Sequence, residues 1–414
     1  MSGLAVVARE LGAAVTGSDR SPDSPFLRRA GIDVAAGHDA ANVPAEAEVV
    51  YSSAIPPDNP ERATAARELH RADLLGELTR LRPTIAVTGT HGKTTTASMV
   101  VHALRGCRLD PSYLVGGEVR STGANAGWGE GEWLVVEADE SDRSLLKLSP
   151  RIAVLTNAEL DHHATYGSQR DVDETFRAFL AMAERVVLGD EPDLARFEGT
   201  VARPEHVELE PGGSRFAFEG VSVQLNVPGA HNARNAATAL AAATLAGADP
   251  TEAAGALADF AGAGRRFERL GTTPAGAIVV DDYAHHPTEV RATIAAARTL
   301  APRRVIAVFQ PHLFSRTRHQ WREFGAALAL ADAVVVLDVY PARERAADFP
   351  GVTGRLVAAA AADSAGGRRV AWLPQLDAAE HYLRSELREG DLLLTLGAGN
   401  VDALGRRLVG RAGE

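Results

Sequence analysis

The sequence has very little cysteine and no long apolar run. Cys107 is the only cysteine among the 414 residues, which excludes an intramolecular disulfide and favours a reducing compartment. No run of about 18 apolar residues is present that could cross a bilayer. The start, "MSGLAVVARELG", lacks the basic segment, apolar core and cleavage site of a secretory signal. We therefore expect a cytoplasmic protein that does not bind a membrane.

Long basic blocks are also missing. The formal net charge is -11, and this charge is spread along the chain, which argues against binding nucleic acid mainly through its phosphates. Arginine supplies almost every cation, because Lys93 and Lys147 are the only lysines. Anionic small molecules are compatible with this composition, since single loops and arginines can bind them locally.

The pattern along the chain is that of an α/β protein with parallel sheets. Short β-branched runs alternate with Ala-rich stretches, and most runs end in Gly, Asp, Asn or His. These polar ends matter because ligands of open α/β sheets bind beyond the carboxyl ends of the strands. Helices are predicted at 4–12 and 235–247, and a polar, less regular insert at 206–229. Strands are predicted at 13–19, 47–56, 84–89, 133–142, 151–163, 185–190, 277–287, 304–312, 333–344 and 391–400.

The chain is too long for one ordinary domain. Its 414 residues predict two to four domains, with three as the central expectation. Breaks in the pattern occur at Arg82–Pro83 and at "GAGRRFERLGTTPAGA" (262–277). We predict domains over residues 1–81, 82–266 and 267–414.

The stretch "VTGTHGKTTT" (87–96) predicts a nucleotide site, although it has two fewer residues between its glycines than the usual P-loop. Glycines let the backbone approach phosphates, the following helix supplies unpaired N–H groups, Lys93 adds a point charge and Thr94 can ligate Mg²⁺. The alternative is a tight strand-to-helix turn. The choice of lysine in a chain rich in arginine favours the nucleotide site, because a compact ammonium suits a narrow phosphate loop.

Acidic and histidine side chains follow two other predicted strands. Singly, such residues are usually solvated or satisfied polar groups, but both segments follow strands of the same predicted sheet as the loop. Mg²⁺ on nucleotide phosphates needs only one or two protein ligands, and Glu137 or a neighbouring carboxylate, with His162, would suit. The residues are Glu137, Asp139, Glu140 and Asp142 of "EADESD", and Asp161, His162 and His163 of "ELDHH".

Nine motifs in order give the sequence a resemblance to the Mur ligases over nearly its whole length. The resemblance implies a UDP-sugar domain of Rossmann type, a central P-loop ATPase domain with a mostly parallel sheet, and a Rossmann-like C-terminal domain. The shortened glycine loop is that family's version of the P-loop. The motifs are "GTHGKTT", "EADESD", "TNAELDHH", "PGAHNARN", "GAGRRFE", "DDYAHHPTEV", "FQPHLFSRTR", "DVYPARE" and "LTLGAGN".

The resemblance also implies a reaction. "DDYAHHPTEV" and "FQPHLFSRTR" are similar to the branch in which ATP phosphorylates the carboxylate of UDP-N-acetylmuramate and the amine of L-alanine attacks the acyl phosphate. Lys93, Thr94 with Mg²⁺, Glu137 and His162 would align and neutralise the phosphates. No nucleic acid, membrane or obligate protein partner is implied. The implied nucleotide-binding residues are Gly89, Thr90, His91, Gly92, Lys93, Thr94, Thr95, Asn232, Asn235, Arg266 and Asp282.

The third domain is expected to bind the amino acid. An arginine fork suits a carboxylate, and His285 is expected to steer or deprotonate the alanine amine. A metal pair of His285 and His286 is the alternative, disfavoured because adjacent side chains diverge at a strand end. For Asn232, a helix N-cap is an equal alternative. The implied residues are Tyr283, His285, His312 and Arg316.

The sequence departs from the family pattern at two places. "MSGLA" resembles the tail of the family's first glycine-rich loop. We expect a start assigned at an internal methionine rather than an altered form of the chain, and weak UDP-sugar binding or poor stability of the 414-residue form. Leu313 stands where relatives often have arginine, which leaves open whether Arg318 assists Arg316. The residues implied for the UDP site are Ser18, Asp19, Ser52 and Ser53.

Three competing functions fit part of the pattern. A recycling ligase that attaches a preformed tripeptide to UDP-N-acetylmuramate would share most motifs. A nucleotide-sensing P-loop protein leaves "DDYAHHP" and "FQPHLFSRTR" unexplained. A Rossmann dehydrogenase is disfavoured, because Gly-Lys-Thr suits a γ-phosphate rather than a dinucleotide.

Overall fold

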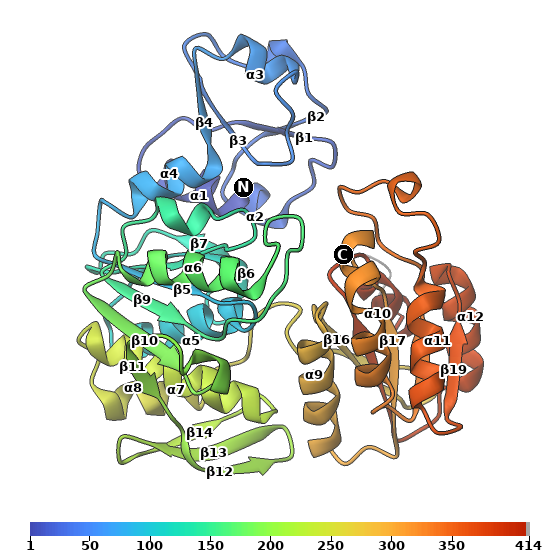
Figure 1. Ribbon diagram of the computed structural model, residues 1–414. Coiled ribbons are helices and arrows are strands. Elements are labelled where there is room, and N and C mark those ends of the chain that lie inside the picture. The colour runs from blue at the N-terminus through green and yellow to red at the C-terminus, as the bar shows by residue number, and fades with distance from the viewer. Residues whose placement is uncertain (411–414) are drawn as a thin grey trace. The chain divides into compact units, whose positions relative to one another are not determined.

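A computed structural model describes residues 1–410 of the chain (Figure 1). Contacts divide it into two compact units, and we treat each by itself. Unit 1 comprises Met1–Leu160, Ser168–Arg203 and Asn235–Leu257, and unit 2 comprises Asp161–Gly167, Pro204–Arg234 and Ala258–Glu414. No helix within residues 1–410 is long and apolar enough to cross a membrane.

Unit 1 is built on a seven-stranded sheet in the order β11-β10-β9-β5-β8-β6-β7, parallel except for the β6–β7 pair. Strand β5 is buried at all five residues, because helices and neighbouring strands cover a central parallel strand on every side. The strands are β5 (Thr84–Thr88), β6 (Ser112–Val119), β7 (Ala124–Gly127), β8 (Leu134–Glu137), β9 (Ile152–Leu155), β10 (Arg185–Gly189) and β11 (Thr200–Ala202). The helices are α5 (Lys93–Gly106), α6 (Gln169–Leu180), α7 (Ala230–Leu245) and α8 (Pro250–Leu257), with α7 divided between the units after Arg234.

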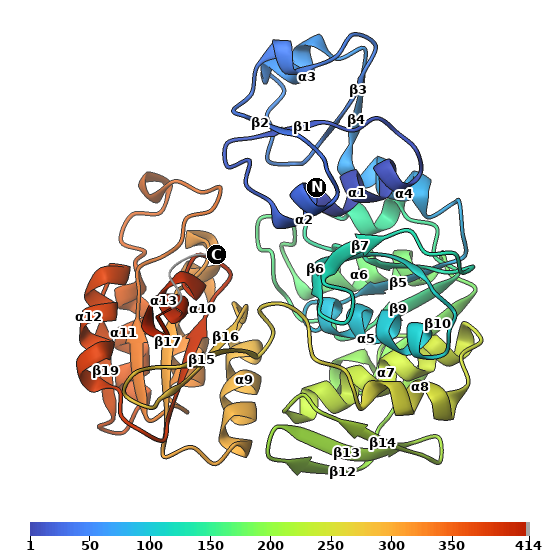
Figure 2. The same ribbon diagram turned by 180° about the vertical axis from the view of Figure 1, so that it is seen from behind.

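The first part of unit 1 adds two small parallel sheets, β1–β2 and β3–β4 (Figure 2). Helix α1 packs on β7, and Gly3 permits this approach, since a Cβ there would lie 3.1 Å from Ala126 Cβ. The elements are α1 (Ser2–Glu10), β1 (Gly17–Asp19), α2 (Pro25–Arg29), β2 (Val34–Ala36), β3 (Glu48–Tyr51), α3 (Pro60–Thr64), β4 (Arg67–His70) and α4 (Arg71–Leu78).

Unit 2 contains a six-stranded sheet in the order β15-β16-β20-β17-β18-β19, parallel except for the edge strand β15. Apolar side chains of α9 to α11 pack on one face of this sheet and those of α12 and α13 on the other, the doubly wound arrangement. The strands are β15 (Glu268–Thr272), β16 (Ile278–Asp282), β17 (Arg304–Phe309), β18 (Ala333–Val336), β19 (Arg369–Trp372) and β20 (Asp391–Leu396). The helices are α9 (Pro287–Thr299), α10 (Phe314–Leu328), α11 (Gly354–Ser364), α12 (Leu376–Glu386) and α13 (Asp402–Leu408).

The polar insert predicted at 206–229 to be less regular is a three-stranded antiparallel sheet with one register shift, between Glu205 and Glu208. Its strands are β12 (Glu205–Glu210), β13 (Gly213–Phe218) and β14 (Val221–Leu225). Phe216, Phe218 and Val223 are buried, so the alternation of "RFAFEGVSVQL" was the signal of a half-buried sheet. By contrast, the predicted α/β class is confirmed, and each of the ten predicted strands contains an observed one.

Candidate active site

The glycine-rich loop of unit 1 joins the buried strand β5 to helix α5. Gly89 has φ +134° and Gly92, the N-cap of α5, has φ +77°, conformations that favour glycine. A Cβ on Gly89 would lie 2.1 Å from Thr156 Oγ1, so no larger residue fits there. The loop leads into the first turn of α5, whose N–H groups have no partner within the helix and are suited to a phosphate.

The segment after β9 fixes this loop, a role that the sequence analysis missed. Asn157 accepts from His91 N at 2.8 Å and donates to His91 O at 3.0 Å, while Thr90 Oγ1 donates to Glu159 O at 2.9 Å. Strands β5 and β9 are adjacent and parallel, so their carboxyl ends meet. The signal was an asparagine directly after a buried strand, since one amide offers both donors and an acceptor.

Lys93 is held on three sides. Its ammonium donates to Gly89 O at 2.6 Å and Thr90 O at 3.1 Å and pairs with Glu140 at 2.9 Å. Burial works to lower the pKa of Lys93, but Glu140 and Glu137 outweigh burial and hold this pKa above its ordinary value. The ammonium therefore stays charged, and the Glu140 carboxylate is the anion that contacts it directly.

Two of the three predicted metal ligands lie together at the start of α5. Thr94 Oγ1 donates to Glu137 Oε2 at 2.9 Å, and the same carboxylate oxygen accepts from Gly116 N at 2.8 Å. A hydroxyl beside a carboxylate is a donor set of hard oxygens that fits Mg²⁺. The third predicted ligand, His162, belongs to unit 2.

An arginine that the sequence analysis did not single out holds the acidic segment after β8. Arg71 Nη2 donates to Asp139 at 2.9 Å and to Asp142 at 2.8 Å. Burial works to raise the pKa of Asp139, but Lys93, Ser141 and Arg71 hold it below its ordinary value. Arg71 thus joins two carboxylates of the acidic segment, and one of them, Asp139, also interacts with Lys93.

The four residues implied for the UDP site lie at separate positions of unit 1. Ser18 Oγ donates to Glu61 at 2.5 Å, and Asp19 accepts from Ser21 N at 2.8 Å. Ser52 contributes its carbonyl oxygen to a turn, accepting from Ile55 N at 3.0 Å. Ser53 Oγ donates to Asp142 at 3.1 Å, so it alone is linked to the acidic segment.

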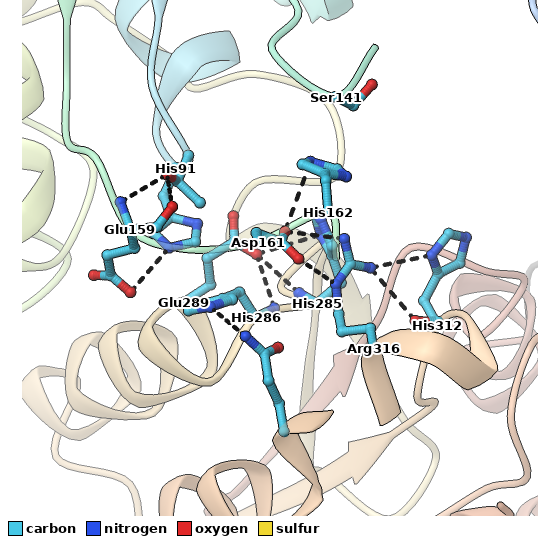
Figure 3. A network of polar contacts seen from close by, with 12 residues as sticks. His91, Ser141, Glu159, Asp161, His162, His285, His286, Glu289, His312 and Arg316 are labelled. Carbon is cyan, nitrogen blue, oxygen red and sulfur yellow. Dashed lines mark hydrogen bonds and ion pairs between the residues drawn. The ribbon is translucent and has the colours of Figure 1, made fainter. Parts of the chain in front are cut away.

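Unit 2 contains a buried ion pair between two polar residues, Asp161 and Arg316, that were predicted to lie at the ends of strands. Arg316 donates from Nε and Nη2 to the two carboxylate oxygens of Asp161, both at 3.0 Å, and the two side chains are 4% and 3% exposed. Arg316 Nη1 lies 3.4 Å from His312 Nδ1, and His162 Nε2 lies 3.7 Å from Asp161 (Figure 3). The pKa of Asp161 lies well below its ordinary value, because Arg316 and His162 outweigh burial.

Other predicted residues of unit 2 lie at the carboxyl end of β16 and in the segment before β15. Arg265 and Arg266 both lie over the Tyr283 ring, at 5.1 and 5.2 Å from its centroid. Asp282 accepts from the backbone N–H groups of Phe267 and Ala284, both at 2.8 Å. Burial raises the pKa of Asp282 to about 6, although Arg266 opposes this change.

The side chains of the two adjacent histidines have different partners, although both backbone N–H groups donate to Glu289. His286 is the N-cap of α9 and accepts from Thr288 N at 3.3 Å, whereas His285 Nδ1 lies 2.9 Å from Tyr283 O. This divergence is expected of neighbouring side chains, and the pair does not form a common ligand set.

Helix α7 begins at Ala230, five residues before its predicted start. Asn232 therefore lies in the first turn and donates to Pro228 O at 2.7 Å, so the N-cap interpretation is wrong. Asn235 lies at the glycine-rich loop, with Oδ1 2.8 Å from the position of a Cβ on Gly92.

Acidification is expected to destabilise the protein through His285. Burial lowers the pKa of this side chain to about 3, so below about pH 6.5 the unfolded chain takes up a proton that the folded chain does not. The free energy of unfolding, measured with denaturant, should fall between pH 7 and pH 5 in the wild type. In His285→Gln this fall should be smaller by about 1–2 kcal/mol. The matched control is the exposed His381→Gln, and equal pH slopes for all three proteins would contradict the prediction.

Comparisons with known proteins find family matches along nearly the whole chain. The domains described as "Mur ligase family, catalytic domain", "Mur ligase middle domain" and "Mur ligase, glutamate ligase domain" match residues 1–82, 87–243 and 265–399. The UDP-N-acetylmuramate--L-alanine ligase of Acidithiobacillus ferrooxidans is 44% identical, over 98% of this chain and 94% of its own.

Solved structures give the same relationship. The UDP-N-acetylmuramate-alanine ligase of Thermotoga maritima superposes with a TM-score of 0.83 at 29% identity, covering 99% of this chain and 96% of its own. A murein peptide ligase of Psychrobacter arcticus has a TM-score of 0.71 at 25% identity, covering 100% and 96%. The chain therefore belongs to the Mur ligase family.

Proposed function

We propose that the protein joins L-alanine to the carboxylate of UDP-N-acetylmuramate at the expense of ATP. A carboxylate oxygen of the sugar takes the γ-phosphoryl group and ADP leaves. The alanine nitrogen then attacks the acyl carbon, loses a proton, and phosphate departs as the amide forms. The similarity to the Acidithiobacillus ligase over 98% of the chain carries this proposal, and the loop around Lys93 supports its ATP half.

The residues of unit 1 are proposed to bind and align ATP. The backbone N–H groups of α5 and Lys93 bind phosphate oxygens, and Thr94 with Glu137 would hold Mg²⁺, which neutralises phosphate charge when bound. Phosphoryl transfer depends mainly on such alignment and charge neutralisation, so no nucleophile on the protein is required. His162, Asn232, Asn235, Arg266 and Asp282 are proposed to complete the nucleotide site.

The residues of unit 2 are proposed to bind the amino acid. A base whose pKa lies at about 3 is poorly matched to an ammonium proton, so we assign His285 to steering the amine through a hydrogen bond rather than to deprotonating it. Tyr283, His312 and Arg316 are proposed to line the same site. Domains over 1–81, 82–266 and 267–414 would then supply the sugar, ATP and amino-acid sites, in the cytoplasm.

A peptide ligase is the second candidate, because the murein peptide ligase of Psychrobacter arcticus shares the fold over the whole chain. Phosphate release from ATP and UDP-N-acetylmuramate should depend on L-alanine and not on an L-alanine-containing tripeptide. Release with the tripeptide alone would favour the recycling reaction. A protein that binds ATP but forms an amide with neither would be a nucleotide sensor.

A further inference from the structure

A pocket in unit 2 places a second arginine next to the Arg316–Asp161 pair. The lining of this pocket includes Asp161, His163, Leu313, Arg316 and Arg343. It therefore combines charged groups with the apolar side chain of Leu313, a combination suited to a small amphipathic ligand.

The charges of this pocket are compensated except at Arg343. Arg316 and Asp161 neutralise each other in their bidentate pair. Glu344 accepts from the backbone N of Ser315 at 2.9 Å, in the first turn of α10, where the helix dipole favours a carboxylate. The guanidinium of Arg343 has no hydrogen bond or ion pair to residues 1–410, so its five donors are available to a ligand.

The backbone on both sides of Arg343 is fixed against the start of α10. Tyr340 N donates to Pro311 O at 2.8 Å, and Leu313 N donates to Tyr340 O at 3.0 Å. On the other side, Glu344 is bound to Ser315 through both oxygens. The exposed side chain of Arg343 thus rises from a short segment that is anchored at both ends.

A second group in the same pocket also lacks a partner. His163 Nε2 is buried without a hydrogen-bond partner within residues 1–410, and its ring lies 4.4 Å from that of His319. A buried polar atom without a partner destabilises the structure, and a hydrogen bond with a polar ligand or a water would offset this cost. The buried His163 nitrogen therefore favours a polar ligand, and the exposed guanidinium of Arg343 makes an anion the preferred one.

We infer that Arg343 binds the carboxylate of the amino-acid substrate and sets the preference for a free amino acid. The inference rests on the proposed function. Arg316 has two of its N–H groups committed to Asp161, so it offers a carboxylate only its remaining donors, whereas Arg343 offers a complete fork. Arg343 accordingly determines specificity for the amino-acid carboxylate, and it adds to the amino-acid-binding residues predicted from the sequence.

The test compares L-alanine with L-alaninamide, which keeps the amine and lacks the carboxylate. Loss of a charge-assisted hydrogen bond in Arg343→Ala should raise KM for L-alanine about 10- to 100-fold and leave kcat and KM for ATP unchanged. The preference for L-alanine over L-alaninamide should fall by the same factor, and Arg343→Lys should recover part of it. Arg345→Ala is the matched control, because Arg345 lies two residues away, is 81% exposed and pairs with Asp348.

The outcomes separate this inference from the proposed function. If the wild type releases no phosphate with L-alanine, the proposed function fails and Arg343 loses its assigned ligand. If the wild type is active but Arg343→Ala keeps its KM for L-alanine and its discrimination against the amide, only the inference is overturned. A fall in kcat together with a lower melting temperature and unchanged discrimination would show a purely structural role and overturn it too.

Discussion

Replacing Lys93 with alanine is expected to reduce kcat for ATP-dependent amide formation by at least about 10³-fold. The ammonium is the cation held closest to the glycine-rich loop, 2.6 Å from Gly89 O and 2.9 Å from Glu140. Without it, the loop presents backbone N–H groups next to a carboxylate that repels phosphate. Phosphate release with UDP-N-acetylmuramate and L-alanine measures the effect.

The same replacement removes the partner of a buried carboxylate, so stability needs a separate control. Glu140 is 4% exposed, and an uncompensated buried charge costs about 3–5 kcal/mol. The double variant Lys93→Met/Glu140→Gln has no such charge and should melt near the wild type while remaining inactive. Full activity in this folded double variant would show that the loop does not bind the transferred phosphate.

The other lysine of the chain offers a matched control. Lys147 pairs with Asp73 at 2.6 Å, and its side chain is 46% exposed, so the pair is worth at most about 1 kcal/mol. Lys147→Ala should therefore keep normal activity and nearly normal stability. This result would show that the loss of activity in Lys93→Ala comes from the position of Lys93 and not from the removal of a lysine.

The strands that carry the site could be predicted because each is a short β-branched run with a polar end. "TIAVTG" and "RIAVLTNAELDHH" became β5 and β9, and the predicted loop lies between β5 and α5. Strands β6 and β7 were missed, since "SYLVGGEV" and "ANAG" are rich in glycine or small residues and lack the composition of a strand. Strand identity there is decided by the pairing of β6 with β8 and of β7 with β6, which a local pattern does not record.

The pairing of polar side chains was the part that the sequence could not supply. Asp161 was predicted only as one of a cluster near a metal, and Arg316 was predicted to bind a carboxylate of the substrate. The two residues are 155 positions apart in the sequence, yet two hydrogen bonds join their side chains. Nothing in either motif specifies the other. Asn157 and Arg71 were missed for the same reason, because their roles arise from strand order and from the packing of α4.

Arg316→Ala is expected to destabilise unit 2 by about 3–5 kcal/mol, because it leaves the Asp161 carboxylate buried without its cation. The folded-state pKa of Asp161 lies below its ordinary value, so the pair stabilises the protein above about pH 4 and that contribution is lost as the pH falls further. In the variant the carboxyl group can escape its penalty by protonation. The stability deficit in denaturant unfolding should consequently shrink between pH 7 and pH 4, and a deficit that is constant with pH would contradict this account.

Arg318→Ala is the matched control, since Arg318 lies on the same helix and is exposed. It should leave stability unchanged, while any rise in its KM for L-alanine would identify it as an assistant to Arg316. The double variant Asp161→Asn/Arg316→Gln replaces the ion pair with neutral polar side chains and leaves no unpaired buried charge, so most of the stability should return. If KM for L-alanine then stays high, Arg316 contributes to binding through its own charge. If KM returns to the wild-type value, the pair serves only to position the start of α10, and Arg343 is the group left to hold the carboxylate.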